Sequence, residues 1–140
     1  MLLGMLFALF TDKGMRGWHC VKILLIDDDV GSLRGMQLAL IMLKHDCSAY
    51  SDPTEAIKSF PCHNYDLVIT DIYMPVMNGF DLAEKIRQLD CEAKIIFISG
   101  YATEVMETYA AGEDQIFLQK PVDFCQLKQI IDNVLTGNAS

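Results

Sequence analysis

Acidic side chains follow two of the most apolar runs in the chain. Asp27, Asp28 and Asp29 come directly after the run ILLI, and Asp71 ends the segment DLVITD. An ionised carboxylate is costly to bury unless it is paired or bound to a cation. Mg²⁺ prefers oxygen ligands and usually takes one or two carboxylates while keeping several waters. We therefore expect Asp27, Asp28 and Asp71 to form a magnesium site, in which Asp28 and Asp71 share the metal.

A hydroxyl and an ammonium follow two further apolar runs. Ser99 ends the run AKIIFIS, and Lys120 follows QIFLQ. A carboxylate beside a metal, a hydroxyl and an ammonium is typical of a phosphoryl acceptor, because the carboxylate attacks phosphorus while the cations offset charge on the transferring oxygens. The residue types therefore predict Asp71 as the nucleophile, with Ser99 and Lys120 beside the phosphoryl group.

The elements that position these residues alternate along the chain. Apolar, β-branched runs predict strands at residues 21–26, 66–71 and 93–99, and shorter segments with a weaker signal predict strands at 47–51 and 115–118. Apolar residues at helical spacing predict helices within residues 30–45, 51–60, 80–89, 103–112 and 122–135. This alternation indicates an α/β fold, a doubly wound (βα)5 parallel sheet with helices on both faces. Ligands of such sheets bind beyond the carboxyl ends of the strands, where the acids, the hydroxyl and the ammonium would meet.

Capping residues mark where three of the helices begin. Asp29 precedes the first helical segment and suits the positive end of its dipole, so we expect it to start that helix rather than to contact the metal. Asp52 followed by Pro53 is typical of an N-cap, and Asp123 with Gln126 forms a second cap pair. Turn-forming residues shape the loop after Asp71: Pro75, Asn78 and Gly79.

The composition is that of one globular domain. The 140 residues are 51% hydrophobic and 21% charged, and the net charge of -8 disfavours direct nucleic acid binding. Five widely spaced cysteines predict reduced thiols and a cytoplasmic protein. Residues 1–10 are apolar, but a membrane span needs roughly 20 such residues. We expect a domain over residues 21–136, an N-terminal extension over 1–20 outside the fold, and a tail over 137–140.

Four motifs, in order within residues 21–135, resemble the receiver domains of two-component response regulators, the CheY-like superfamily. They are ILLIDDD, DLVITDIYMPVMNGFDL, IIFISGYA and FLQKPVD. The resemblance implies a flavodoxin-like fold with sheet order 2-1-3-4-5. It also implies that Asp71 is the phosphoacceptor, that Asp27 and Asp28 are the acidic pair with Asp28 a direct Mg²⁺ ligand, and that Tyr73 offers the metal its backbone carbonyl.

The same resemblance assigns the residues that respond to phosphorylation. Lys120 would bind the phosphoryl group, and the Lys120–Pro121 bond would be cis. Ser99 and Phe117 would be the switch residues. Phe117 has no hydroxyl where many relatives carry tyrosine, and the segment between Gly112 and Lys120 is one residue longer than is common.

The resemblance further implies a signalling role, in which the domain is no enzyme beyond catalysing its own phosphorylation and dephosphorylation. A sensor histidine kinase or a phosphotransfer protein would supply the phosphoryl group. The output would be a changed surface on the fourth helix, fifth strand and fifth helix, within residues 103–112, 115–118 and 122–135. A partner protein or a second copy, forming a homodimer, would dock there.

Three other functions fit the sequence less well. An aspartyl-phosphate phosphatase needs an acid two residues after its nucleophile, where this chain has Tyr73. A flavin-binding module needs a hydroxyl- and glycine-rich first loop, and DDDVGS has the wrong charge. A receiver that no longer accepts a phosphoryl group and serves only as a docking domain would not need the full set of Asp27, Asp28, Asp71, Ser99 and Lys120. A receiver from a longer transcription factor or hybrid kinase is an alternative context for the same domain.

Overall fold

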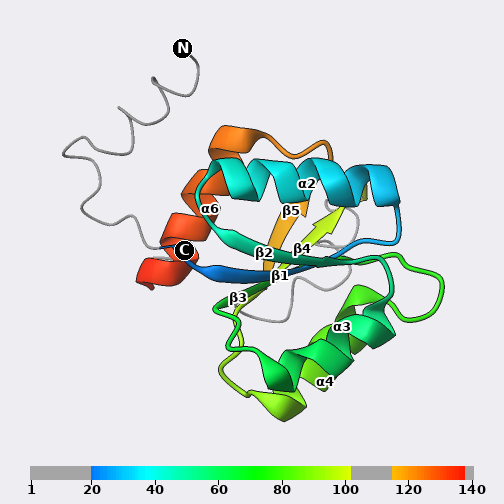
Figure 1. The fold of residues 1–140 in the computed structure, drawn as a ribbon. Coiled ribbons are helices and arrows are strands. Elements are labelled where there is room, and N and C mark those ends of the chain that lie inside the picture. The colour runs from blue at the N-terminus through cyan, green and yellow to red at the C-terminus, as the bar shows by residue number, and fades with distance from the viewer. Residues whose placement is uncertain (1–19, 102–114, 138–140) are drawn as a thin grey trace.

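The computed structural model describes residues 20–101 and 115–137, which form one parallel sheet with helices on both faces (Figure 1). The strands are β1 (Lys22–Ile26), β2 (Asp46–Tyr50), β3 (Leu67–Asp71), β4 (Ile95–Ser99) and β5 (Ile116–Gln119). Their order across the sheet is β2-β1-β3-β4-β5, and every neighbouring pair is parallel. This confirms the expected fold and strand order. The helix predicted within residues 103–112 lies outside the described residues.

Within residues 20–101 and 115–137, two helices cover each face of the sheet. Helices α2 (Val30–Met42) and α6 (Phe124–Thr136) lie on one face, and α3 (Pro53–Ser59) and α4 (Gly79–Leu89) lie on the other (Figure 1). Each face has its own apolar core, which contains Leu33, Leu40, Leu127 and Ile131 on the α2 side and Ala56, Leu82, Ile86 and Phe97 on the α4 side. Among the described residues, no helix has the length and apolar character to cross a membrane.

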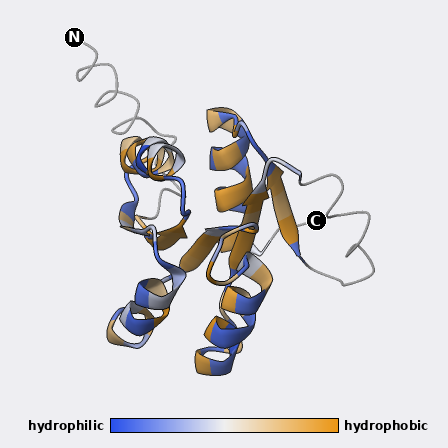
Figure 2. Cartoon of the chain, turned by 90° about the vertical axis from the view of Figure 1, so that its right-hand side faces the viewer, coloured by the Kyte–Doolittle hydropathy of each residue, from blue (hydrophilic) through white to orange (hydrophobic). Residues whose placement is uncertain are grey.

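The central strands are buried on both sides, which explains their continuous apolar runs. Strands β1, β3 and β4 are almost wholly buried, whereas the edge strand β2 is only half-buried. Figure 2 shows the strands as predominantly hydrophobic and the helices as mixed in hydropathy. The weaker sequence signal for the second and fifth strands follows from their positions at the two edges of the sheet.

The capping predictions for three helices are confirmed. The carboxylates of Asp29, Asp52 and Asp123 accept hydrogen bonds from the backbone N–H groups two or three residues ahead. Helix α3 ends at Ser59, one residue earlier than predicted, and continues as the short 3₁₀ helix η2 (Phe60–Cys62). Pro61 lacks the N–H that would extend the α-helical hydrogen-bond ladder.

Candidate functional site

The strand register brings the candidate site residues together at the carboxyl ends of the strands. Ile26 of β1 pairs with Thr70 of β3, so the next residues, Asp27 and Asp71, emerge at the same level. On the other side of β3, Asp71 pairs with Ile98, which places Ser99 one step further along β4. A parallel sheet with matched strand ends therefore assembles the site without any long loop.

A cluster of three carboxylates lies at the carboxyl ends of β1 and β3. Asp27, Asp28 and Asp71 each offer one oxygen, and these oxygens all lie within 4.8 Å of one another. The side chains of Asp27 and Asp71 are 8% and 12% exposed, while Asp28 is exposed to solvent. Three hard oxygen donors at this spacing fit a Mg²⁺ ion that keeps part of its water shell on the solvent side.

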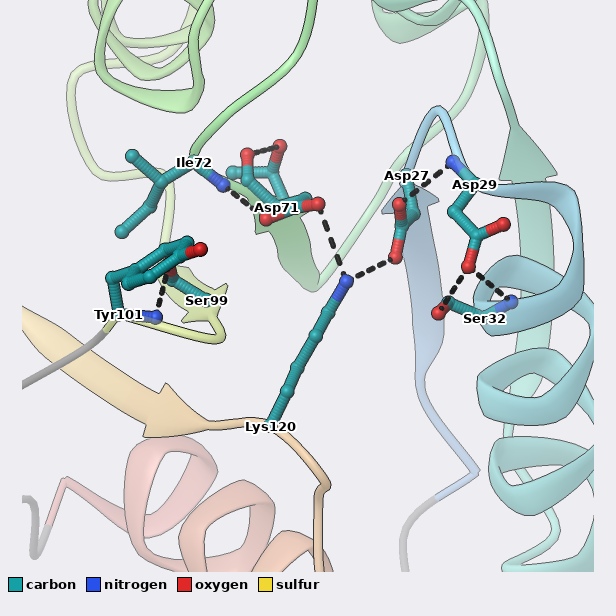
Figure 3. A network of polar contacts seen from close by, with 9 residues as sticks. Asp27, Asp29, Ser32, Asp71, Ile72, Ser99, Tyr101 and Lys120 are labelled. Atoms are coloured by element: carbon teal, nitrogen blue, oxygen red, sulfur yellow. Dashed lines mark hydrogen bonds and ion pairs between the residues drawn. The ribbon is translucent and has the colours of Figure 1, made fainter.

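Backbone N–H groups fix the two buried carboxylates. Asp27 Oδ1 accepts a hydrogen bond from the N–H of Asp29 at 3.0 Å, and Asp71 Oδ1 accepts one from the N–H of Ile72 at 2.8 Å. Figure 3 shows both bonds, with the Asp27 and Asp71 side chains facing each other across Lys120. Each carboxylate therefore keeps its second oxygen for the ammonium or a metal.

Lys120 bridges the two carboxylates. Its Nζ lies 2.8 Å from Asp27 Oδ2 and 3.2 Å from Asp71 Oδ2 (Figure 3). Burial lowers the pKa of Lys120, but the hydrogen bond to Asp27 and the charges of both carboxylates outweigh it, so the pKa lies above its ordinary value. Lys120 is therefore a fixed cation at neutral pH. The Lys120–Pro121 peptide bond is cis, as the resemblance implies.

The charges at the site do not balance. Burial raises the pKa of Asp71 above its ordinary value, the charge of Lys120 lowers it, and the charge of Asp27 raises it again. One ammonium faces three carboxylates, so the local charge is negative when all of them are ionised. A divalent cation would neutralise the remaining negative charge. The charge of the cluster, like its oxygen donors, therefore supports a Mg²⁺ site.

The predicted switch residues lie beside this cluster. Ser99 is 1% exposed, and its Oγ accepts a hydrogen bond from the N–H of Tyr101 at 3.0 Å. The ring of Phe117 is partly buried, with centroid distances of 5.5 Å to Phe97 and 6.2 Å to Phe80. Phe117 therefore packs against Phe97, its partner on the neighbouring strand, and is part of the aromatic cluster on the α4 side of the sheet.

Asp29 does not join the carboxylate cluster. Its Oδ2 accepts hydrogen bonds from the Ser32 hydroxyl at 2.7 Å and the Ser32 N–H at 3.3 Å (Figure 3). These bonds lower the pKa of Asp29 below its ordinary value. The expectation that Asp29 starts a helix is confirmed.

The sequence reading missed two contributors to the site. Gly79 lies so close to the β3 end that a Cβ at this position would collide with the carbonyl oxygen of Asp71. Tyr101 holds the Ser99 hydroxyl through its backbone N–H, and its ring lies against that of Tyr73. Gly79 gave a turn signal together with Pro75 and Asn78, and Tyr101 lies within the motif IIFISGYA, but no sequence signal marked its backbone N–H as a partner of Ser99.

A cavity of about 470 Å³ adjoins the site between α2 and α6. Asp27, Asp71 and Lys120 line its polar end, and the rest of its wall is largely apolar: Leu25, Ile26, Met36, Ala39, Ile98, Val122, Phe124 and Leu127. The Asp71 carboxylate therefore lies at the wall of this cavity.

Comparison with known proteins places this geometry in a family. The family model described as "Response regulator receiver domain" matches residues 23–132. An uncharacterized response regulatory protein of Staphylococcus epidermidis is 36% identical over 115 residues, which cover 79% of this chain and 45% of that protein. The response regulator receiver protein CpdR of Brucella abortus is 30% identical over 115 residues, covering 81% of this chain and 96% of CpdR.

A solved structure resembles the domain over most of its length. The response regulator protein TrrA from Thermotoga maritima, in complex with Mg²⁺-BeF, is 30% identical and has a TM-score of 0.73, over 82% of this chain and 99% of that one. The chain spans less than half of the staphylococcal relative and nearly all of CpdR.

Proposed function

Because the chain belongs to the response regulator receiver domain family, a signalling module of two-component systems, we propose that it accepts a phosphoryl group on Asp71. The observation that carries this proposal is the bridge from Lys120 to Asp27 and Asp71, with Asp28 in the same carboxylate cluster. This arrangement holds a buried carboxylate nucleophile next to a fixed cation and to oxygen donors suited to Mg²⁺.

The transfer step follows from these positions. An Asp71 carboxylate oxygen attacks the phosphorus of a phosphohistidine, the N–P bond breaks, and the leaving imidazole takes a proton. The product is an acyl phosphate on Asp71. Lys120 would then pair with a phosphoryl oxygen, and the Ser99 hydroxyl would donate to another. When bound by Asp27, Asp28, Asp71 and the Tyr73 carbonyl, Mg²⁺ supplies charge neutralisation at the transferring oxygens.

Phosphorylation would act by shifting a population between two packings of the same fold. The new group carries close to two negative charges and attracts Ser99 and Lys120. Drawing Ser99 toward the phosphoryl group would vacate space that the Phe117 ring, which stacks on Phe97, could turn inward to fill. The surface affected would include β5, α6 and residues 103–112, where a partner or a second copy would bind.

The partners proposed are a sensor histidine kinase or a phosphotransfer protein as phosphodonor, in the cytoplasm. The domain itself would catalyse only its own phosphorylation and dephosphorylation, and the acidic net charge of -8 argues against direct contact with nucleic acid. A longer regulator or hybrid kinase is an equally suitable context, since the chain spans less than half of the staphylococcal relative.

Intact-mass measurement tests the acceptor assignment. With Mg²⁺ and acetyl phosphate we expect one added phosphoryl group, labile to base, and none in Asp71→Asn. Asp46→Asn is the matched control, because Asp46 is exposed at the opposite end of the sheet and should leave labelling intact. Undiminished labelling of Asp71→Asn would refute the proposal.

A further inference from the structure

Two exposed tyrosine rings, from the segments that follow β3 and β4, contact each other. Tyr73 is 56% exposed and Tyr101 is 60% exposed, yet their rings contact each other edge to face, with centroids 5.9 Å apart and planes at 83°. Tyr73 comes two residues after Asp71, and Tyr101 comes two residues after Ser99. The ring contact therefore joins the loop that follows β3 to the loop that follows β4.

The backbone of Tyr101 also fixes the Ser99 hydroxyl. The Tyr101 N–H donates to Ser99 Oγ, and Figure 3 shows this bond. A hydroxyl has one proton to donate and two lone pairs to accept with. Because Ser99 uses a lone pair for Tyr101, its own proton stays available for an acceptor, and the bond limits where Oγ can lie.

The loop after β3 is anchored independently of the rings. The Ile72 N–H donates to Asp71 Oδ1 at 2.8 Å, and the Gly79 N–H donates to the Ile72 carbonyl at 2.7 Å. Tyr73 is therefore attached to a backbone whose position is set by the acceptor residue itself. A ring held by this loop can transmit that position to Tyr101 and so to Ser99.

We propose that the Tyr73–Tyr101 ring contact is a clasp that positions the Ser99 hydroxyl to donate to the phosphoryl group on Asp71. This inference rests on the proposed function and assigns a role to two side chains that the acceptor chemistry leaves unused. The clasp works by pre-organisation: the hydroxyl is held near the acceptor before the phosphoryl group arrives, so less ordering is needed when it binds.

Beryllofluoride, a phosphoryl mimic, measures the positioning directly. In saturating Mg²⁺, Tyr101→Ala and Tyr73→Ala should each weaken beryllofluoride binding about three- to tenfold, the range for one aromatic pair. The double variant should bind beryllofluoride no more weakly than either single variant, because each of the three proteins has lost the same ring contact. Tyr101→Phe keeps the ring and should bind beryllofluoride like the wild type.

The Ser99→Ala background separates positioning from general loop structure. Without the hydroxyl, Tyr101→Ala should have no further effect on beryllofluoride binding. Val76→Ala is the matched control, because Val76 is 73% exposed on the same loop as Tyr73 and should leave binding unchanged. Thermal melts of all variants establish that they fold.

Several results would overturn the clasp. These are unchanged or tighter binding in both alanine variants, additive losses in the double variant, or a loss that persists in Ser99→Ala. A shorter lifetime of the acyl phosphate with unchanged beryllofluoride affinity would assign the rings to water exclusion and would also overturn it. Failure of the proposed function shows separately, as absent labelling of the wild-type Asp71.

Discussion

The Lys120 ammonium lies 3.2 Å from the Asp71 carboxylate, although 49 residues separate them in the chain. Lys120 also pairs with Asp27, from a third strand. One cation thus joins the carboxyl ends of β1, β3 and β5. Without the Lys120 ammonium, the poorly solvated carboxylates of Asp27 and Asp71 would face each other unpaired. Because like charges at such close range repel, the loss should destabilise the fold.

Replacing Lys120 by alanine should destabilise the metal-free protein. We expect a loss of about 1–2 kcal/mol in the free energy of unfolding, less than for a fully buried pair because the Lys120 side chain is 27% exposed. Urea unfolding in EDTA at low salt measures it. Lys128→Ala breaks a pair that is 42% and 50% exposed, and should cost under about 0.5 kcal/mol. Equal losses in the two variants would contradict a special role for Lys120.

Asp71→Asn should raise the melting temperature of the metal-free protein at neutral pH. Burial raises the pKa of Asp71, so the contribution of this group to stability is fully present below its unfolded pKa and is lost as pH rises through the folded value. At pH 7 the ionised carboxylate therefore opposes folding, and a neutral amide removes that opposition. Calorimetry in EDTA should show an increase of a few degrees.

Added Mg²⁺ provides the control for this stability effect. Mg²⁺ should raise the melting temperature of the wild type more than that of Asp71→Asn, because the wild type has one more carboxylate to offer. The Asp46→Asn protein should behave like the wild type with and without the metal. A lower melting temperature for Asp71→Asn in EDTA would show that the pair with Lys120 outweighs the cost of burial.

His45 should make the protein less stable as pH falls below neutrality. Burial lowers the pKa of His45, with the charge of Asp132 opposing, and its Nδ1 accepts a weak hydrogen bond from the Val21 N–H at 3.4 Å. A lowered pKa means that the stability is fully present above the unfolded pKa of about 6.5 and is lost as pH falls through the folded value.

Urea midpoints between pH 7.5 and about pH 5 measure the His45 effect. The fall in midpoint should be smaller in His45→Gln, which cannot gain the proton. His63→Gln changes an exposed histidine and should leave the pH profile as it is in the wild type. Identical profiles for His45→Gln and the wild type would rule out His45 as the source.

The sequence allows prediction of the strands with strong apolar runs and of the residues that lie at their carboxyl ends. Asp27 follows β1, Asp71 ends β3 and Lys120 follows β5, so a parallel sheet with short loops had to bring them to the same end of the strands. The stacking of Phe117 on Phe97 and the contact between two tyrosines depend on side-chain packing between segments distant in sequence. Periodicity along one chain carries no information about such contacts, so they could not be predicted.

Gly79 lies against the backbone of Asp71, and its replacement by alanine tests whether this close approach holds the proposed acceptor in place. A Cβ at Gly79 would collide with the Asp71 carbonyl oxygen and crowd the Ile72 Cα, and both are backbone atoms that cannot move aside cheaply. We expect a loss of about 1–3 kcal/mol in unfolding free energy. We also expect slower phosphorylation by acetyl phosphate, because a shift of about 1 Å at a nucleophile can cost ~100-fold in rate.

Gly35→Ala is the matched control: a Cβ there meets no atom within 4 Å, and alanine in the middle of α2 should stabilise the protein by about 0.5–1 kcal/mol. If Gly79→Ala matched Gly35→Ala in both stability and phosphorylation rate, the close approach of α4 to the β3 end would have no part in holding Asp71.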